Sequence, residues 1–215
     1  MTDRPHVFLP GTGRPLLLLH GTGGTEHDLL PLRDELAPGA PVLAPRGTVL
    51  ENGMARHFRR LREGVFDEDD LRERVAELAG FLDEAERAYG VAPGAWTAVG
   101  FSNGANMAAA TLLLRPDALA GAALFAVMVP FADPPPVDLD HRPVAVVNGR
   151  HDPMATPRLT ATLVGQLRER RAVVEEFPHR GGHAVAPATL PGVRAFLDRE
   201  LRSNDDRRAS PEALA

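Results

Sequence analysis

Short hydrophobic runs recur along the chain and alternate with longer amphipathic stretches. Within a run the apolar residues mostly follow one another directly, which is typical of strands buried on both faces of a sheet. The runs predicted to form buried strands are Leu16–Leu19, Pro41–Ala44, Trp96–Phe101, Ala122–Val129, Val144–Val147 and Val173–Phe177. An earlier run, His6–Leu9, is predicted to form an edge strand.

The stretches between these runs carry hydrophobic residues at helical spacing. The clearest is Asp67–Tyr89, in which Leu71, Val75, Leu78 and Leu82 recur at steps of three and four. The other predicted helices are Asn103–Arg115, Pro157–Arg171 and Pro187–Leu201. Strands that alternate with helices indicate crossover connections, so the predicted fold class is α/β with a doubly wound, mostly parallel sheet.

The length of the chain fits one compact domain. With 215 residues, the chain is predicted to form a single α/β domain over residues 1–202 and a polar, frayed C-terminal tail over residues 203–215. The run Pro134–Pro136 marks a connecting loop rather than a domain boundary.

Charge and hydropathy restrict the partners. A net charge of −5 and a pI of about 5.9 argue against a nucleic-acid partner. No run reaches the roughly 20 apolar residues of a membrane helix, and the N-terminus lacks the pattern of a signal peptide. We therefore expect a cytoplasmic protein that does not insert into membranes and that acts on a small molecule.

The absence of Cys and Lys and the scarcity of Ser narrow the chemistry. The chain has no Cys, which excludes a disulfide framework, a cysteine nucleophile and Cys-ligated zinc. It has no Lys, which excludes Schiff-base chemistry and a P-loop lysine. Its only serines are Ser102, Ser203 and Ser210, and the last two fall in the predicted tail. One serine, Ser102, therefore remains in the predicted domain.

Ser102 occupies a motif that carries chemistry. The sequence Gly100-Phe101-Ser102-Asn103-Gly104 fits the G-x-S-x-G pattern and stands between a predicted strand and a predicted helix. In that context the serine sits on a tight turn that presents its hydroxyl above the sheet, at the positive end of the helix. We therefore interpret Ser102 as a nucleophile; the alternative is a helix N-cap in a glycine-rich turn.

A serine nucleophile needs a base, and the base needs an orienting acid, in the chain order Ser, Asp or Glu, His. His183 lies in a loop between the last predicted strand and the last predicted helix, and His179 competes with it from the end of that strand. Asp152 follows the strand Val144–Val147 and is the candidate acid. A metal site at His179 and His183 would need further ligands, so no metal is expected.

The tetrahedral intermediate of acyl transfer needs donors for its oxyanion. One is expected from the backbone N–H of Asn103, the residue after the nucleophile. The other is expected from the loop His20–Gly24, where Thr22 is the first choice and Gly23 the alternative. His20 is interpreted as a residue that orders this loop by hydrogen bonding.

These residues resemble the phospholipase/carboxylesterase family of α/β-hydrolases, and within it the bacterial hydroquinone-responsive carboxylesterases. The matching segments are Leu18–Gly24, Asp28–Leu32, Val49–Met54, Arg59–Asp67 and Ser102–Asn106. The resemblance implies an α/β-hydrolase fold, a Ser102–Asp152–His183 triad, and hydrolysis of small carboxylic or aromatic esters without a cofactor. It also implies a possible homodimer.

Two departures from the family pattern concern the pocket. His57 stands where the family has Phe, and Ala126–Val129 replaces a segment richer in His. The connection Pro130–Pro143 is too short for a helical lid, so we expect an open site without interfacial activation by lipid. The residues expected to contact substrate are Gly23, Met54, Arg59, Phe66 and Met128.

The sequence allows two roles for Arg59. Its side chain either binds a substrate carboxylate or pairs with Glu51, Glu63 or Asp67 at the surface, and we favour surface pairing. Two other functions also stay open: a thioesterase or lysophospholipase-like hydrolase with the same triad, and a non-catalytic ligand-binding protein of the same fold.

Overall fold

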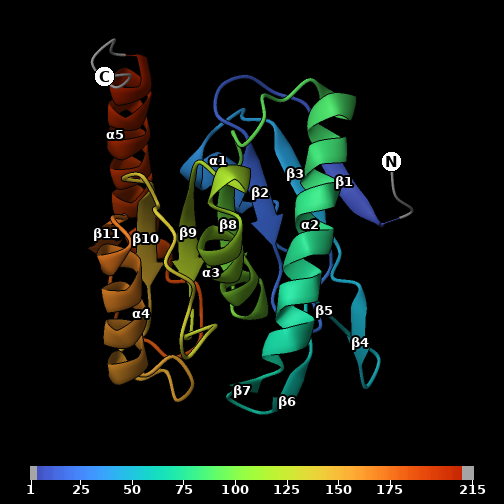
Figure 1. Cartoon of the computed structure of the whole chain (residues 1–215), viewed down its shortest axis with the longest axis vertical. Coiled ribbons are helices and arrows are strands. Elements are labelled where there is room, and N and C mark those ends of the chain that lie inside the picture. The colour runs from blue at the N-terminus through green and yellow to red at the C-terminus, as the bar shows by residue number, and fades with distance from the viewer. Residues whose placement is uncertain (1–3, 210–215) are drawn as a thin grey trace.

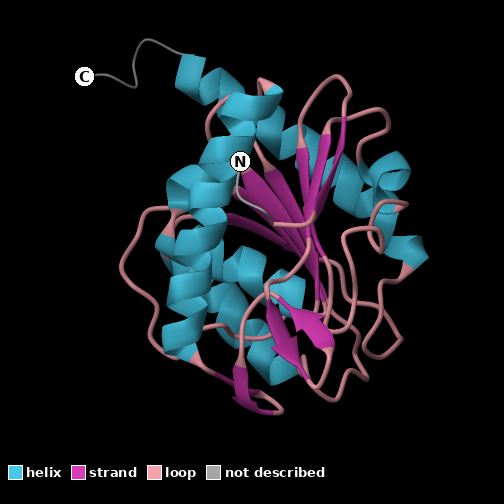
Figure 2. Ribbon diagram, turned by 90° about the vertical axis from the view of Figure 1, so that its right-hand side faces the viewer, coloured by secondary structure: helices cyan, strands magenta, loops and turns pink. Residues whose placement is uncertain are grey.

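The protein folds as a twisted sheet between two layers of helices (Figures 1 and 2). The structure is a computed structural model that describes residues 4–209. Its strands are β1 (His6–Leu9), β2 (Leu16–Leu19), β3 (Val42–Pro45), β4 (Val49–Glu51), β5 (Met54–Arg56), β6 (Arg60–Arg62), β7 (Val65–Phe66), β8 (Thr97–Phe101), β9 (Gly121–Phe125), β10 (Pro143–Val147) and β11 (Val173–Glu176). Its helices are α1 (Leu32–Leu36), α2 (Glu68–Tyr89), α3 (Asn103–Leu114), α4 (Pro157–Glu169) and α5 (Leu190–Ala209), with 3-10 turns at Pro116–Ala118 and Pro187–Thr189.

The central sheet has the strand order β1-β3-β2-β8-β9-β10-β11. All neighbouring strands in it are parallel except β1, which pairs with β3 in the antiparallel sense at the edge. This confirms the predicted doubly wound α/β fold and the predicted edge position of β1.

The continuous apolar runs are explained by the two helical layers. Leu17 and Leu19 of β2 pack in one core with α2, α3 and α4. Leu16 and Leu18 of the same strand pack in a second core with α1 and α5. Because successive side chains of a strand point to opposite faces, a strand covered on both sides needs an apolar residue at every position.

The helix α2 begins and ends where the sequence predicts. The side chain of Asp67 accepts a hydrogen bond from the backbone N–H of Asp70, and Gly90 ends the helix in the left-handed conformation with φ of 68°. Both are the usual solutions for unsatisfied backbone groups at helix ends.

The C-terminal helix is longer than predicted. The tail predicted from residue 203 is wrong as far as Ala209, because α5 continues to that residue. Asn204 is buried on this extension and donates to the carbonyl oxygen of His141, and Arg14 pairs with Asp205 at 2.8 Å. These contacts give a polar segment tertiary partners; residues 210–215 of the predicted tail lie outside the described part.

Two hairpins that the hydrophobic pattern does not predict lie between β3 and α2. The first joins β4 to β5 through Asn52 and Gly53, which both have positive φ, and the second joins β6 to β7. Asn-Gly is the preferred pair for such a turn. Figure 1 shows both hairpins at the end of the molecule to which the arrows of β2 and β9 point.

Buried histidines connect the first hairpin to the loop after β2. His20 accepts a hydrogen bond from the N–H of Gly47 at Nε2, so its Nδ1 carries the proton and donates to the carbonyl oxygen of Gly21. Burial lowers the pKa of His20. The ring of His57 lies 4.5 Å from that of His20. His20 therefore orders the loop as a neutral imidazole.

Of the two histidines, His57 is the more costly to bury. It is 1% exposed, and neither ring nitrogen has a partner with hydrogen-bond geometry among residues 4–209. Burial holds the pKa of His57 well below the ordinary range. Protonation of His20 and the charges of Arg4 and Arg56 act in the same direction, while the backbone of His20 opposes the shift. The folded protein therefore contains His57 in its neutral form.

This burial predicts an acid-dependent loss of stability. Above the ordinary imidazole pKa of about 6.5 the neutral His57 has no protonation penalty. Below it the unfolded chain binds a proton on His57 and the folded protein does not, which lowers the free energy of unfolding by up to about 1.4 kcal/mol per pH unit. We expect His57→Phe to reduce the fall in the free energy of unfolding between pH 7 and pH 5, measured by urea denaturation. His27→Gln, at an exposed imidazole, is the control and keeps the wild-type slope; equal slopes in all three proteins would contradict the assignment.

Candidate active site

Ser102 lies at the turn between β8 and α3 in a strained backbone conformation. Its φ is 51° and its ψ is −113°. A Cβ atom at Gly104 would lie 2.0 Å from the carbonyl oxygen of Leu19, and one at Gly100 would lie 2.6 Å from the Cα atom of Ala105. Both positions therefore need glycine, which is the physical basis of the G-x-S-x-G pattern.

The structure brings Ser102, His183 and Asp152 into one hydrogen-bonded chain. The distance from Ser102 Oγ to His183 Nε2 is 2.8 Å, and the distance from His183 Nδ1 to Asp152 Oδ2 is also 2.8 Å. His179, the alternative base, instead accepts a hydrogen bond from the N–H of Gly181 at Nδ1. Among the candidate bases, His183 is therefore the one in contact with Ser102.

The Asp152 carboxylate is positioned for a buried, charged role. Its side chain has no exposed surface, whereas 22% of the His183 side chain is exposed. Burial by itself raises the pKa of Asp152, but hydrogen bonds from the N–H of Ala155, from the N–H of Met154 and from His183 outweigh it and hold the pKa below its usual range. Asp152 is therefore ionised beside His183.

The loops that carry the acid and the base are joined through their backbones. The N–H of Arg150 donates to the carbonyl oxygen of His179 at 2.8 Å, and the N–H of His151 donates to that of Gly181 at 3.2 Å. A Cβ atom at Gly149 would lie 2.3 Å from the Gly181 carbonyl oxygen. This close contact sets the distance between the two side chains.

The backbone hydrogen bonds distinguish the two candidate donors in the loop after β2. The N–H of Gly23 donates to the carbonyl oxygen of Ala55 at 2.8 Å, so it is already used. Thr22 lines the cavity beside Ser102, and so does Asn103, the first residue of α3. The geometry therefore favours Thr22 over Gly23.

The side chains of two asparagines, Asn103 and Asn106, hold the walls of the site. The sequence had pointed only to the backbone N–H of Asn103. The side-chain oxygen of Asn103 accepts from the N–H of His57 at 2.7 Å, and that of Asn106 accepts from the N–H of Met128 at 2.8 Å. They belong to the segment Ser102–Asn106 that carries the family resemblance. Their three-residue spacing, which places both on one face of α3, was the feature of the sequence that could have predicted this role.

The segment after β9 differs from the prediction and forms one wall. The predicted strand Ala122–Val129 ends at Phe125, because Ala126 has φ of 54° and turns the chain. The N–H groups of the next two residues then donate to side chains, that of Val127 to Asn148 and that of Met128 to Asn106. Met128 therefore reaches the site from a loop.

A cavity of about 250 Å³ lies against Ser102 and His183. Its apolar walls include Phe66, Phe101, Met128 and Met154. Its polar walls include Thr22, Asn103, Asn106, Arg56 and Arg60. Of the residues expected to contact substrate, Phe66 and Met128 line this cavity, and Gly23, Met54 and Arg59 do not.

Arg59 lies outside the cavity because acidic residues hold it elsewhere. Its side chain is 61% exposed and its Nε lies 3.3 Å from Asp70 and 3.6 Å from Asp67. This matches the surface-pairing interpretation. Its neighbours Arg56 and Arg60 point into the site, and the sequence did not separate them from Arg59 because the hairpins were not predicted.

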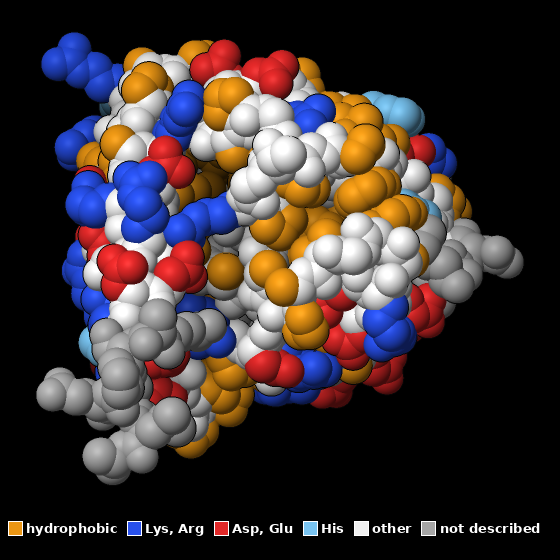
Figure 3. Space-filling view, turned by 90° about the horizontal axis from the view of Figure 1, so that it is seen from above, with side chains coloured by type: hydrophobic (Ala, Val, Ile, Leu, Met, Phe, Trp, Pro, Cys, Tyr) orange, Lys and Arg blue, Asp and Glu red, His pale blue; other side chains and the backbone are white. Residues whose placement is uncertain are grey.

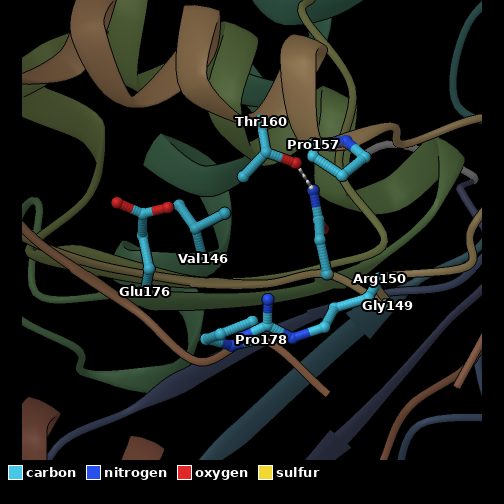
Figure 4. A pocket seen from close by; sticks show the side chains of 8 residues that line it. Val146, Gly149, Arg150, Pro157, Thr160, Glu176 and Pro178 are labelled. Carbon is cyan, nitrogen blue, oxygen red and sulfur yellow. Dashed lines mark hydrogen bonds between the residues drawn. The ribbon is translucent and has the colours of Figure 1, made fainter. Parts of the chain in front are cut away.

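Other cavities lie away from Ser102, including the following two. One, of about 300 Å³, lies between β10, β11 and the start of α4, and Glu176 and Arg150 line its sides (Figure 4). The side-chain amide of Asn148 donates to Thr160 Oγ1 at 2.8 Å in its wall. Another, of about 530 Å³, lies among the loops that precede β2, β3 and β8. Figure 3 views that end of the molecule, where hydrophobic side chains gather across the middle and charged ones along the left edge. No triad residue lines either cavity.

The described residues show two further absences. No helix within residues 4–209 is both long and apolar enough to cross a membrane. In the same range no group of three or more His, Asp or Glu side chains is arranged to hold a metal ion.

The fold and sequence can be compared with known proteins. No protein-family model matches the chain. MhqD of Bacillus subtilis (strain 168), which is described as a putative hydrolase, is 46% identical over 181 residues, which span 84% of this chain and 90% of MhqD. The crystal structure of the Bacillus cereus carboxylesterase is 40% identical, with a TM-score of 0.89 over 92% of this chain and 95% of that one. The carboxylesterase from Mesorhizobium loti is 30% identical, with a TM-score of 0.86 over 92% of this chain and 97% of that one.

The identity to MhqD extends over most of both chains, and the structural similarity to carboxylesterases covers nearly the whole described fold. Together with the parallel sheet and its sharp turn after β8, these findings identify a hydrolase. The chain belongs to the phospholipase/carboxylesterase-like α/β-hydrolases, together with MhqD.

Proposed function

We propose that the protein is a serine carboxylesterase that hydrolyses small carboxylic esters through an acyl-enzyme on Ser102. The observation that carries the proposal is the chain of two 2.8 Å hydrogen bonds from Ser102 through His183 to Asp152. A serine hydroxyl becomes nucleophilic when a neighbouring base takes its proton during attack. Its place beside a cavity gives an ester carbonyl access to it.

In the first step Ser102 Oγ attacks the ester carbonyl carbon and His183 Nε2 takes the serine proton. Asp152 accepts the Nδ1–H of His183, which keeps Nε2 free as the base and stabilises the imidazolium once it forms. The carbonyl oxygen becomes an oxyanion, which the backbone N–H groups of Thr22 and Asn103 stabilise. Asn103 begins α3, so the positive end of the helix dipole adds to this stabilisation.

In the second step the C–O bond to the alcohol breaks and His183 gives its proton to the leaving oxygen. Water then attacks the acyl-enzyme, His183 takes a proton from that water, and the carboxylic acid leaves as Ser102 regains its proton. The cycle consumes one water and needs no other co-reactant.

The cavity restricts the size of the substrate. Its volume of about 250 Å³ suits a short acyl or a single-ring group better than a long acyl chain. Phe66 and Phe101 line it and offer apolar ring surfaces to such groups. These features favour a small ester, including an aromatic one, over the long-chain substrate of a lysophospholipase-like enzyme or an acyl-protein thioesterase.

The role of Ser102 is tested by substitution. We expect Ser102→Ala to lower kcat for p-nitrophenyl acetate by at least about 10⁴-fold, because the attacking atom is lost. Ser203→Ala is the matched control, since Ser203 is the other serine of the described residues and lies on α5. A fluorophosphonate probe is expected to label wild type and Ser203→Ala but not Ser102→Ala.

The same experiment separates the alternatives. Full activity in folded Ser102→Ala would refute the proposal. A folded wild-type protein that neither hydrolyses esters nor reacts with the probe would indicate a non-catalytic ligand-binding protein. A panel of p-nitrophenyl esters and thioesters of graded chain length would show which acyl length and which leaving atom are preferred.

The open site predicts ordinary kinetics at a lipid surface. No helix is formed between β9 and β10, so nothing in this connection can act as a helical lid. We expect the rate with tributyrin to follow one saturation curve through the solubility limit, measured by pH-stat titration. A sharp rise at the limit, as a lidded lipase shows when run in parallel, would contradict this expectation.

A further inference from the structure

Two arginine side chains line the cavity beside Ser102, and neither the triad nor the oxyanion hole uses them. Arg56 is almost completely buried, with 4% of its side chain exposed, and Arg60 has 27% exposed. No Asp or Glu is among the residues that line this cavity within the described part of the chain. The cavity therefore presents two guanidinium groups and no carboxylate.

One carboxylate stands behind both guanidinium groups. Glu51 Oε1 accepts from Arg60 Nε at 2.9 Å, and Glu51 Oε2 lies 3.2 Å from Arg56 Nε. One negative charge therefore balances two positive charges, which leaves a surplus of about one positive charge. The contacts are made at the Nε atoms, on the side of each guanidinium group that faces Glu51.

Three other acidic groups near the site already have partners. Asp67 and Asp70 lie against Arg59 outside the cavity. Asp152 is fully buried behind His183, which stands between it and the cavity. These carboxylates therefore do not neutralise the surplus positive charge of Arg56 and Arg60.

Arg56 is close to the reacting atoms. Its Nη1 donates to Thr22 Oγ1 at 2.7 Å, which places the guanidinium group beside the loop of the oxyanion hole. Its Nε also donates to the carbonyl oxygen of Phe58 at 3.1 Å. These bonds fix the plane of the guanidinium group before any ligand arrives, and an arginine remains charged even where burial lowers its pKa.

We infer that Arg56 and Arg60 form a carboxylate-binding subsite, and that the enzyme selects esters whose acyl part carries a carboxylate, such as half-esters of short dicarboxylic acids. The inference rests on the proposed esterase function. A planar guanidinium group binds a carboxylate through paired N–H donors, and a partly buried one loses less to water than an exposed one. We place the substrate carboxylate on the acyl part because the leaving alcohol oxygen must face His183 Nε2, whereas Arg56 lies beside Thr22.

The test uses two p-nitrophenyl esters with the same acyl chain, one ending in a carboxylate and one in a neutral methyl ester: p-nitrophenyl hydrogen glutarate and p-nitrophenyl methyl glutarate. After subtraction of each ester's full rate of hydrolysis without enzyme, which for the anionic ester includes attack by its own carboxylate, we expect wild-type kcat/KM to favour the anionic ester by about tenfold, the size expected for one charge-assisted contact. The preference should decrease as NaCl is raised, because salt screens the partly exposed Arg60.

Substitution locates the effect. Arg60→Gln leaves Arg56 and Glu51 as a balanced pair, so we expect the ratio of kcat/KM values for the two esters to fall to about one. Arg59→Gln is the matched control: it removes an arginine from the same segment, but one that lies outside the cavity, and we expect it to keep the wild-type ratio. Thermal melting of each variant shows that it is folded.

The outcomes distinguish this inference from the proposed function. If wild type hydrolyses both esters equally through Ser102, the subsite is refuted and the esterase function stands. A ratio that falls in Arg59→Gln and persists in Arg60→Gln would also refute the subsite. If wild type hydrolyses neither ester nor p-nitrophenyl acetate, the proposed function itself fails. If Arg60→Gln does not fold, competitive inhibition of wild type decides: glutarate should inhibit more strongly than its dimethyl ester, and equal inhibition would overturn the inference.

Discussion

Ser102 holds a backbone conformation that L-residues rarely adopt, and every other part of the site is arranged around it. Such a conformation costs about 1–3 kcal/mol and persists only where the surroundings enforce it. Here the N–H of Ser102 donates to the carbonyl oxygen of Phe125 at 2.9 Å, and the N–H of Asn106 donates to that of Ser102 at 2.9 Å. The backbone of Gly104 lies so close to Leu19 that no side chain fits between them. The turn is thus held by β2, β9 and α3 together.

The other loops of the site are fixed by backbone contacts rather than by flexible side chains. The Asp152 and His183 loops meet at Gly149 and Gly181. The loop of Thr22 is tied to the first hairpin through Gly23, whose N–H donates to Ala55. A site of this kind needs little rearrangement when charge develops on the substrate, which is the main requirement of electrostatic catalysis.

The hydrophobic pattern predicted the parts of the molecule whose structure is decided by burial. The seven strands of the central sheet follow directly from it, because both faces of the sheet are covered by helices, and so does the amphipathic helix α2. The arrangement of Ser102, Asp152 and His183 could be anticipated because a parallel sheet brings the ends of its strands to one edge.

The pattern failed where short polar segments are held by specific contacts. The hairpin residues are mostly exposed or half-exposed, so the turn residues Asn52 and Gly53 were the remaining signal. The end of β9 depends on Asn106 and Asn148, which lie far from it in the sequence. The same limitation left Arg59 among the residues expected to contact substrate, although surface pairing was favoured for it, since only the hairpin geometry separates it from Arg60.

Under the proposed function and the proposed carboxylate subsite, catalysis and selectivity belong to different parts of the fold. The reacting groups stand on the sheet and its tight turns, whereas Arg56, Arg60 and Glu51 stand on the hairpins. The surplus positive charge also lies beside Thr22, so with a neutral ester its field helps to stabilise the oxyanion. An anionic acyl group neutralises that field when it binds. Under the proposed mechanism, the guanidinium groups would therefore act on such an ester mainly through binding and a lower KM, and the proposed oxyanion donors, the backbone N–H groups of Thr22 and Asn103, would stabilise the transition state.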